Sequence, residues 1–352
     1  MARPADPRQS VGLWSAAKVL LLAAAIGSGV FLVWHLAQVL LLLFGSVLVA
    51  ILLRSIAGPV ARHTPIPDPG AVALAALIIV ALLVGFIFLL GTQIRAQGAA
   101  LLERLPDLVQ AVEDQLGVDV LGEWLRRQQA QGVDGRDLVL GLAGFTTRAI
   151  SAAAKLLVVL AAGIYLALNP ALYLNGIVKL VPPSQQAKAR DTLSALGRAL
   201  RLWLAGQLAA MAVVGILVTL GLTLLGIPSA LALGVIAGLF EFVPIVGPVA
   251  SAVPAVASGL MDSPRTALWV AGLYVLVQQA EGILIQPLLQ QRTAHLPPVL
   301  TMFAVLGFGV LFGPLGVLLA TPLAVACLVL VQKLWVREVL HEPVSVPGEE
   351  AR

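Results

Sequence analysis

Long apolar segments alternate with short polar ones along most of the chain. About 20 apolar residues suffice to cross the hydrocarbon core of a bilayer, so five segments are predicted to span it as helices. They lie at about 14–34, 39–57, 70–92, 151–169 and 203–226. His35 to Gln38 are expected to form a turn between the first two helices. The apolar runs are continuous rather than alternating, which favours helices over a transmembrane barrel.

Prolines, glycines and amides interrupt the apolar pattern in the last third of the chain. Three stretches are affected: 229–260, 266–290 and 299–332. In the third stretch, helix breaks are expected at Gly313-Pro314 and again at Thr321-Pro322. If each stretch crosses once, the chain has about eight spans. Alternatively, 229–260 and 299–332 form hairpins that enter and leave on one side, and the pattern leaves both arrangements open.

A long polar stretch at 93–148 separates the third and fourth predicted spans. Its apolar residues recur at the spacing of one face of a helix. This stripe comprises Leu108, Val109, Val112 and Leu116. We expect a small amphipathic helical insert outside the bilayer, whose stripe packs on the membrane surface or on a neighbouring subunit.

The loop at 170–201 is rich in lysine and arginine, and Asp191 is its only acidic residue. Ser184 is expected to cap a helix. The apolar side of this helix would hold Leu193, Leu196, Leu200 and Trp203. The pattern predicts a basic helix at the membrane interface, and the alternative is a solvated charged linker.

Composition places the chain in a membrane. Of its 352 residues, 59% are hydrophobic and 11% are charged, and the mean hydropathy is +0.98, which excludes a soluble globule. The formal charge of +4 is interpreted as a surplus of Lys and Arg on cytoplasmic loops rather than as a nucleic-acid surface. The single cysteine, Cys327, excludes disulfides and thiolate metal sites within one chain.

These observations predict an all-α, polytopic transmembrane helix bundle with broken or re-entrant helices in its C-terminal half. Basic residues crowd the N-terminal tail, the end of the second span, the loop at 170–201 and the C-terminal tail, so both termini are expected in the cytoplasm. Four regions are predicted: a three-span segment at 1–92, the helical insert at 93–150, a five-span transport core at 151–335 and a tail at 336–352.

Two carboxylates, Glu241 and Glu281, lie deep within apolar segments. A charged group in hydrocarbon costs several kcal/mol, so an intramembrane acid is a candidate functional site. Burial would make proton exchange near neutral pH feasible. The structural alternative is a carboxyl group that stays protonated and hydrogen-bonded between helices.

The run around Glu241 predicts a broken helix. Pro244 and Pro248 remove amide donors, and Gly247 lies between them. In membranes, broken helices are tolerated where they are buried in protein or line a cavity, and in transporters they form substrate or ion sites. An ordinary proline kink is the alternative.

Amides surround the second acid. Gln278, Glu281 and Gln286 are expected broadly on one side of a helix, with Pro287 next to them. Such a surface suits a hydrophilic solute or a hydrated monovalent cation. Equally, glutamines can hold helices together through hydrogen bonds, and both readings stay open.

The sequence lacks the motifs of an enzyme. It has no HExxH, CxxC, P-loop or GxSxG pattern. Its four histidines lie far apart, so neither a metal site nor a cofactor is expected. Without a P-loop, any active transport would depend on a gradient.

The C-terminal third resembles the autoinducer-2 exporter family of bacterial membrane proteins. The resemblance rests on FVPIVGP at 242–248, EGILIQPLLQQRTAHLPPVL at 281–300 and GVLFGPLGVLLATPLAV at 309–325. The matching positions are Pro244, Gly247, Pro248, Glu281, Pro287, Pro298, Gly313, Gly316, Ala320 and Pro322. Pro314 accompanies the Gly313 break. The glutamines around Glu281 depart from the family pattern.

The resemblance implies a multi-pass transporter in the bacterial plasma (inner) membrane that exports a small hydrophilic solute or signal molecule. Some members of the family are described as sodium(lithium)/proton antiporters, which is the first alternative. A non-transporting scaffold that binds a partner through 93–148 is the second. Membrane lipid and the solute or cation are the expected partners; nucleic acid is not expected, and a homo-oligomer is left open.

Overall fold

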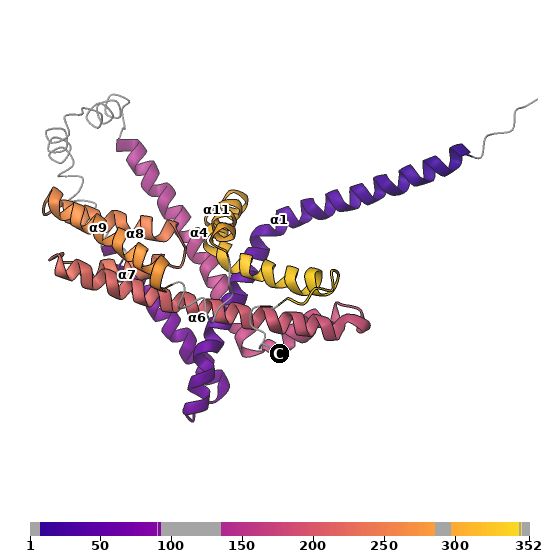
Figure 1. Cartoon of the computed structure of the whole chain (residues 1–352), viewed down its shortest axis with the longest axis horizontal. Helices are drawn as coiled ribbons and strands as arrows, with labels where there is room; N and C mark the ends of the chain where they lie inside the picture. Colours follow the sequence, from indigo (N-terminus) through magenta and orange to yellow (C-terminus); the bar gives the residue numbers. More distant parts are fainter. Residues whose placement is uncertain (1–7, 90, 93–134, 286–296, 345, 347–352) are drawn as a thin grey trace, which may run out of the picture.

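The computed structural model describes residues 8–89, 91–92, 135–285, 297–344 and 346, and all regular structure among them is helical. The all-α class predicted from the sequence is therefore confirmed. Figure 1 shows most helices gathered together, while the beginning of α1 (Arg8–His63) extends away from them. The predicted amphipathic stripe within 93–134 lies outside the described residues.

Several helices can cross a membrane. Within the described ranges, four are long and apolar enough: Leu36–His63, Asp68–Leu89, Pro183–Leu224 and Val299–Arg337. A fifth candidate is a bent pair of helices, if the pair is counted as one span. It consists of Ala153–Leu168, the end of α4 (Gly135–Leu168), and α5 (Pro170–Lys179), which meet at 89°. The predicted count of about eight spans stays a prediction.

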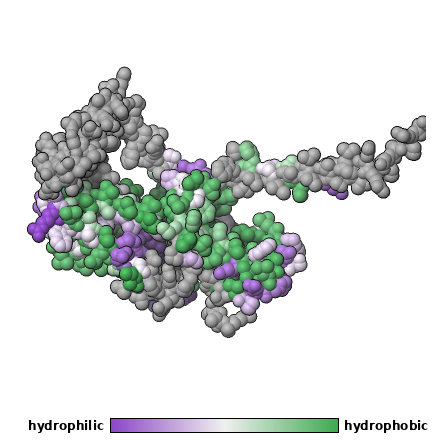
Figure 2. All heavy atoms as spheres, turned by 45° about the horizontal axis from the view of Figure 1, so that its top comes forward, coloured by the Kyte–Doolittle hydropathy of each residue, from purple (hydrophilic) through white to green (hydrophobic). Residues whose placement is uncertain are grey.

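The outside of the protein is largely apolar. Leu224 and Val310 are 89% and 87% exposed, and hydrophobic residues dominate the face shown in Figure 2. An apolar surface of this extent is unfavourable in water and favourable against lipid tails. The protein is therefore a multi-pass membrane protein.

The first helix differs from the sequence prediction. α1 is helical without interruption from Arg8 to His63, so the turn expected at His35 to Gln38 is wrong. His35 to Gln38 include neither proline nor glycine, so nothing at these four positions removes a helical hydrogen bond.

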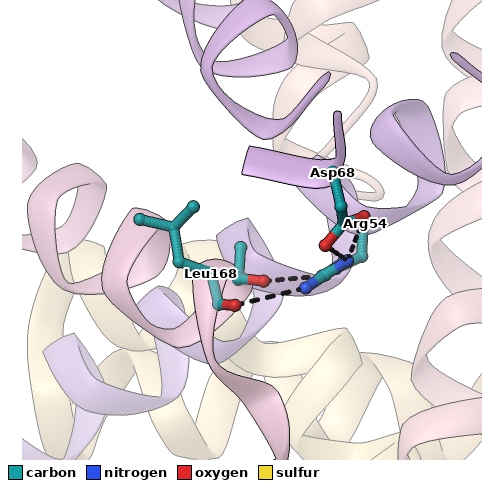
Figure 3. A network of polar contacts seen from close by, with 4 residues as sticks. Arg54, Asp68 and Leu168 are labelled. Carbon is teal, nitrogen blue, oxygen red and sulfur yellow. Dashed lines mark hydrogen bonds and ion pairs between the residues drawn. The ribbon is translucent and has the colours of Figure 1, made fainter. Parts of the chain in front are cut away.

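Arg54 of α1 joins three helices through polar contacts (Figure 3). Its Nε donates to the carbonyl oxygen of Ala167 at 2.6 Å, and its Nη2 donates to that of Leu168 at 3.4 Å. Its Nη1 donates to both carboxylate oxygens of Asp68 at 2.8 Å. The arginine thereby satisfies carbonyls left open where α4 ends and ties them to the start of Asp68–Leu89.

A long helix, α6 (Gln186–Leu224), passes through the centre of the fold. Ser184 does not cap it: Pro183–Gln185 forms a 3₁₀ turn, η1, and Gln185 occupies the cap position without a side-chain bond. The expected apolar side is present, but Leu200 and Trp203 are buried against Leu319 and other core residues rather than facing the membrane. The location of this helix at the membrane interface stays a prediction.

Small residues bring α6 close to α7 (Ala230–Phe240). A Cβ added at Gly234 would overlap the hydroxyl of Thr219, and one added at Gly238 would lie 2.6 Å from the carbonyl oxygen of Met211. Gly215 of α6 faces both glycines. This is the small-xxx-small packing that lets helix backbones approach in membranes.

The interrupted C-terminal stretches form paired helices. α7 and α8 (Val246–Leu260) have 11 and 15 residues, about 16 and 22 Å at 1.5 Å per residue. Each is shorter than the roughly 30 Å hydrocarbon core, and the two helices contact each other. The arrangement favours the hairpin alternative for 229–260.

α11 (Pro298–Leu330) is divided at Gly313, whose φ is 66° and ψ −149°. A Cβ at Gly309 would lie 2.8 Å from Val317 of the second segment, so the segments fold back on each other beside the bend. The second predicted break is wrong: Pro322 is buried within a helix that continues to Leu330. A single proline removes one hydrogen bond, which the packed core tolerates here.

The remaining helices complete the C-terminal half. α9 (Pro264–Ala280) begins at Ser263, whose hydroxyl accepts from the Thr266 amide at 3.1 Å. Two π-helical segments follow other helices: η2 (Glu281–Ile285) continues α9, and η3 (Val331–Arg337) continues α11. One core cluster joins α6, α7, α8 and α9. Another joins α1, α6 and α11.

Candidate functional site

The candidate site is built around the break between α7 and α8. α7 ends at Phe240, and the chain resumes a helix only at Val246. Ile245, which comes directly after Pro244, has φ +71° and ψ −54°, and the Val246 amide donates to the Pro244 carbonyl oxygen at 2.8 Å; this is a γ-turn of the rare, strained kind. Such strain persists only where the surroundings hold it in place. The break predicted from the prolines is therefore confirmed.

Gly247 explains how the chain turns so tightly. A Cβ at this position would overlap the carbonyl oxygen of Phe240, so only glycine allows the first turn of α8 to approach the end of α7. Pro248 follows it within the first turn of α8, where a missing amide hydrogen leaves no helical bond unmade.

Glu241 occupies the end of α7 and is 2% exposed. Its amide donates to the carbonyl oxygen of Ala237 at 3.0 Å. Its own carbonyl oxygen accepts from Nε2 of Gln207 at 2.8 Å. Gln207 lies on α6 and satisfies one of the carbonyls that end-of-helix geometry leaves open.

Glu241 and Glu281 come together. Glu281, the first residue of η2, is 5% exposed, and the two carboxyl groups lie close enough for a hydrogen bond between them. A carboxylate has no hydrogen to donate, so this bond requires a proton on one of the two groups. The pair resembles other buried carboxyl pairs in which two acids share one proton.

Gln278 extends the pair. Its Nε2 donates to Oε2 of Glu281 at 2.8 Å, which confirms that these two residues lie on one side of the helix. The side chain of Gln278 is exposed, so the polar group reaches from the buried pair to the protein surface. Gln279 is exposed as well.

The other predicted residues are distributed differently. Gln286 and Pro287 lie outside the described residues. Pro298 is the first residue of α11, and Gly313 with Pro314 forms the bend of that helix. Phe242 and Phe312 flank the two breaks and pack against the same core cluster, so the breaks are connected through that core.

A cavity adjoins the second bend. About 270 Å³ in volume, it lies between α1 and α11 and is lined by Leu41, Leu311 and Phe312, with Gln38 as its one strongly polar side chain. A larger groove of about 480 Å³ between α6 and α7 is mainly apolar. Neither cavity is lined by Glu241 or Glu281.

Sequence reasoning missed Gln207. It is a polar amide in an apolar run, which is the same signal that indicated the later glutamines. Its hydrogen-bond partner, however, lies 34 residues away in the sequence. Among the described residues, no group of three or more His, Cys, Asp or Glu side chains could hold a metal ion.

A multi-pass helical protein with a carboxyl pair at a helix break has the architecture of a transporter. Residues 19–335 match the family described as AI-2E family transporter, and the chain belongs to that family. The recognition made from the C-terminal motifs is thereby confirmed.

Individual relatives support a role in transport. The chain is 34% identical to YueF of Bacillus subtilis over 145 residues, which are 41% of this chain and 39% of the relative. It is 32% identical to MT0215 of Mycobacterium tuberculosis over 51% of each chain. It is 29% identical to YhhT of Escherichia coli K12 over 47% of this chain and 42% of the relative. All three are named "putative transport protein", and the matched regions span about two fifths to one half of their lengths.

Proposed function

We propose that the chain moves a small hydrophilic solute across the bacterial plasma membrane, along a path beside the α7–α8 break. The observation that carries the proposal is the hydrogen-bonded pair of Glu241 and Glu281 at this break, within a family of transporters. Buried carboxyl groups in a membrane are costly, and transport is the common reason for retaining them.

The site offers the polar groups that a hydrophilic solute needs. Gln278 presents an amide at the surface, and the pair presents carboxyl oxygens. Autoinducer-2 is the solute that the family resemblance favours, and export is the direction that follows from it.

A second candidate is sodium(lithium)/proton antiport, which the carboxyl pair favours specifically. When the shared proton leaves, two negative groups remain in contact and repel each other. A monovalent cation in the proton's place relieves that repulsion. Binding of cation and proton is then mutually exclusive, which is the requirement for exchange.

Flux in proteoliposomes tests both candidates. Wild type, Glu241→Gln and Glu281→Gln are compared for uptake of labelled autoinducer-2 and of Na⁺ under imposed pH gradients. Asp262→Asn is the matched control, because Asp262 lies at the adjacent α8–α9 turn and bonds to Thr266. Because the acids form one pair, either glutamine variant should reduce flux at least about tenfold and flatten its pH dependence.

The outcomes separate the candidates. Solute flux lost in both variants without any Na⁺ movement supports export, and Na⁺ flux coupled to protons supports antiport. If both glutamine variants insert normally and keep wild-type flux of both substrates, the proposed site is wrong. A scaffold that acts through 93–148 then becomes the better account.

We also propose that both termini and the loop at 170–201 face the cytoplasm, while 93–148 lies outside, because Lys and Arg crowd the former. Single cysteines at Ser184 and Gln128 in a Cys327→Ala background report the orientation. Ser184 should be labelled by an impermeant reagent only after the membrane is opened. Its labelling in intact cells would contradict this topology.

A further inference from the structure

The short helix α5 lies at the edge of the predicted membrane region. It follows the spanning candidate Ala153–Leu168 after a bend of 89°. A helix at a right angle to a spanning helix lies close to the plane of the membrane. Asn169 and Pro170 separate the two helices, and proline disfavours helical conformation in the residue before it.

The surface of α5 is apolar and uncovered. Val178 is its only buried residue. Leu172 is 67% exposed, Ile177 is 49% exposed, and Leu180, directly after the helix, is 85% exposed. Lys179 is exposed beside them. Apolar side chains with a terminal lysine, on a helix parallel to the membrane, fit the boundary between headgroups and acyl chains.

The first half of α6 supplies positive charge next to α5, which it contacts. Arg190, Arg198 and Arg201 are exposed. At 100° per residue, they lie on the side opposite the buried Ala195, Ala199 and Trp203. The arginine side therefore points away from the protein core.

The position of these arginines along α6 matches the membrane boundary. Leu202–Leu224 contains no charged residue and, at 23 residues, is about 34 Å long, slightly more than the hydrocarbon core. Arg201 precedes this run directly, and Arg198 lies about one turn further out. Both are therefore at the depth of lipid headgroups.

Nearby acids are engaged elsewhere. Asp191 forms an ion pair with the buried Lys333 of η3, and Glu338 forms one with Lys188. Within the described part of the chain, neither Arg190 nor Arg201 has an ion-pair partner. Arg190 and Arg201 thus keep their charge for a ligand outside the protein.

We propose that α5 and the arginine side of α6 form a binding surface for anionic phospholipid headgroups. The apolar residues of α5 insert at the interface, and the positive charges of the three arginines attract the lipid phosphates. The sequence predicted a basic helix at the membrane interface, and its arginine side, opposite the buried Leu200 and Trp203, supplies the contact.

Spin-labelled lipids test the proposal in proteoliposomes of the full chain. Electron paramagnetic resonance gives the preference of the protein for labelled phosphatidylglycerol over labelled phosphatidylcholine. Three proteins are compared with wild type: the triple variant Arg190→Gln/Arg198→Gln/Arg201→Gln, the same triple change to Lys, and Arg265→Gln. Arg265 is an exposed arginine in the first turn of α9 and serves as the control.

Wild type should prefer phosphatidylglycerol, with each arginine contributing up to about fivefold at its site, equivalent to about 1 kcal/mol. The triple Gln variant should lower the ratio toward one, the triple Lys variant should retain most of the preference, and Arg265→Gln should not change it. An unchanged ratio in the triple Gln variant overturns the proposal. So does a wild-type preference abolished by inorganic phosphate but not by chloride of equal ionic strength, because the surface then binds free phosphate.

Discussion

The two sharp turns of the C-terminal half each contain a residue with positive φ and a glycine close to a backbone carbonyl, and they differ in their polarity. At the α7–α8 break, Ile245 has φ +71° and Gly247 lies against the carbonyl of Phe240. At the α11 bend, Gly313 has φ +66° and Gly316 lies against the carbonyl of Phe308. Only the first turn carries a buried carboxyl group.

The surroundings of the second turn are apolar by contrast. Phe308 and Phe312 stack with their ring centroids 6.0 Å apart, and leucines line the cavity beside them. The comparison separates the ability to form a turn from the polar groups placed at that turn. Glycine and proline make a turn in an apolar segment, whereas Glu241, Glu281 and Gln207 add chemistry to one of the two turns.

The largest loss of stability is expected when the closely packed glycine of either turn is replaced, and the loss should be the same at both turns. In Gly247→Ala and Gly316→Ala the new methyl group would overlap a backbone carbonyl. The backbone must move, so each variant should lose more than about 3 kcal/mol of stability. The yield of monodisperse protein in detergent and its melting temperature measure this loss.

Gly307→Ala is the matched control, because a Cβ there meets nothing within 4 Å. It should behave as wild type. If Gly247→Ala and Gly316→Ala are as stable as Gly307→Ala, the close approach does not determine either turn.

A smaller effect, restricted to the first turn, is expected from Gln207→Leu. The variant leaves the Glu241 carbonyl without its donor, at a cost of about 1–3 kcal/mol. It should lower the melting temperature by several degrees. Gln38→Leu is the control, because Gln38 is exposed and lines the cavity beside the second turn. Equal losses in the two variants would mean that the turns do not differ in polar support.

The smallest effect concerns the end of the chain beyond the α11 bend. The hydrogen bond from Lys188, aided by its charge, lowers the pKa of the exposed Glu338 below its ordinary value of 4.5. The stabilisation is therefore present above pH 4.5 and is lost as the pH falls and Glu338 is protonated.

Lys188→Gln should accordingly lower the melting temperature slightly at neutral pH and not at all in acid. Differential scanning fluorimetry at a series of pH values measures this difference, with Glu338→Gln as the companion variant. A difference that persists unchanged in acid would mean that Lys188 acts through another contact.

The sequence predicted local features of the fold well. Pro244 and Gly313 mark real breaks, and the spacing of Gln278 and Glu281 correctly placed them together. An error occurred where the packing of neighbouring helices decides the outcome: a break was expected at Pro322, which lies in an intact, buried helix.

The central contacts of the site could not be predicted from spacing. Glu241 and Glu281 are 40 residues apart in the sequence and meet only because α8 and α9 return the chain to the end of α7. Their spacing therefore predicted two separate acids. Gln207 reaches Glu241 from α6, and a lone amide in an apolar helix does not identify its partner.

The shared proton between Glu241 and Glu281 is the central claim, and infrared spectroscopy tests it most directly. A protonated carboxyl group absorbs separately from a carboxylate, so the difference spectrum between wild type and each glutamine variant isolates the pair in membranes at neutral pH. We expect wild type to show a hydrogen-bonded protonated carboxyl band that disappears or shifts in both Glu241→Gln and Glu281→Gln and is unchanged in Asp262→Asn. Absence of that band in wild type, or its persistence unchanged in both glutamine variants, would contradict the account.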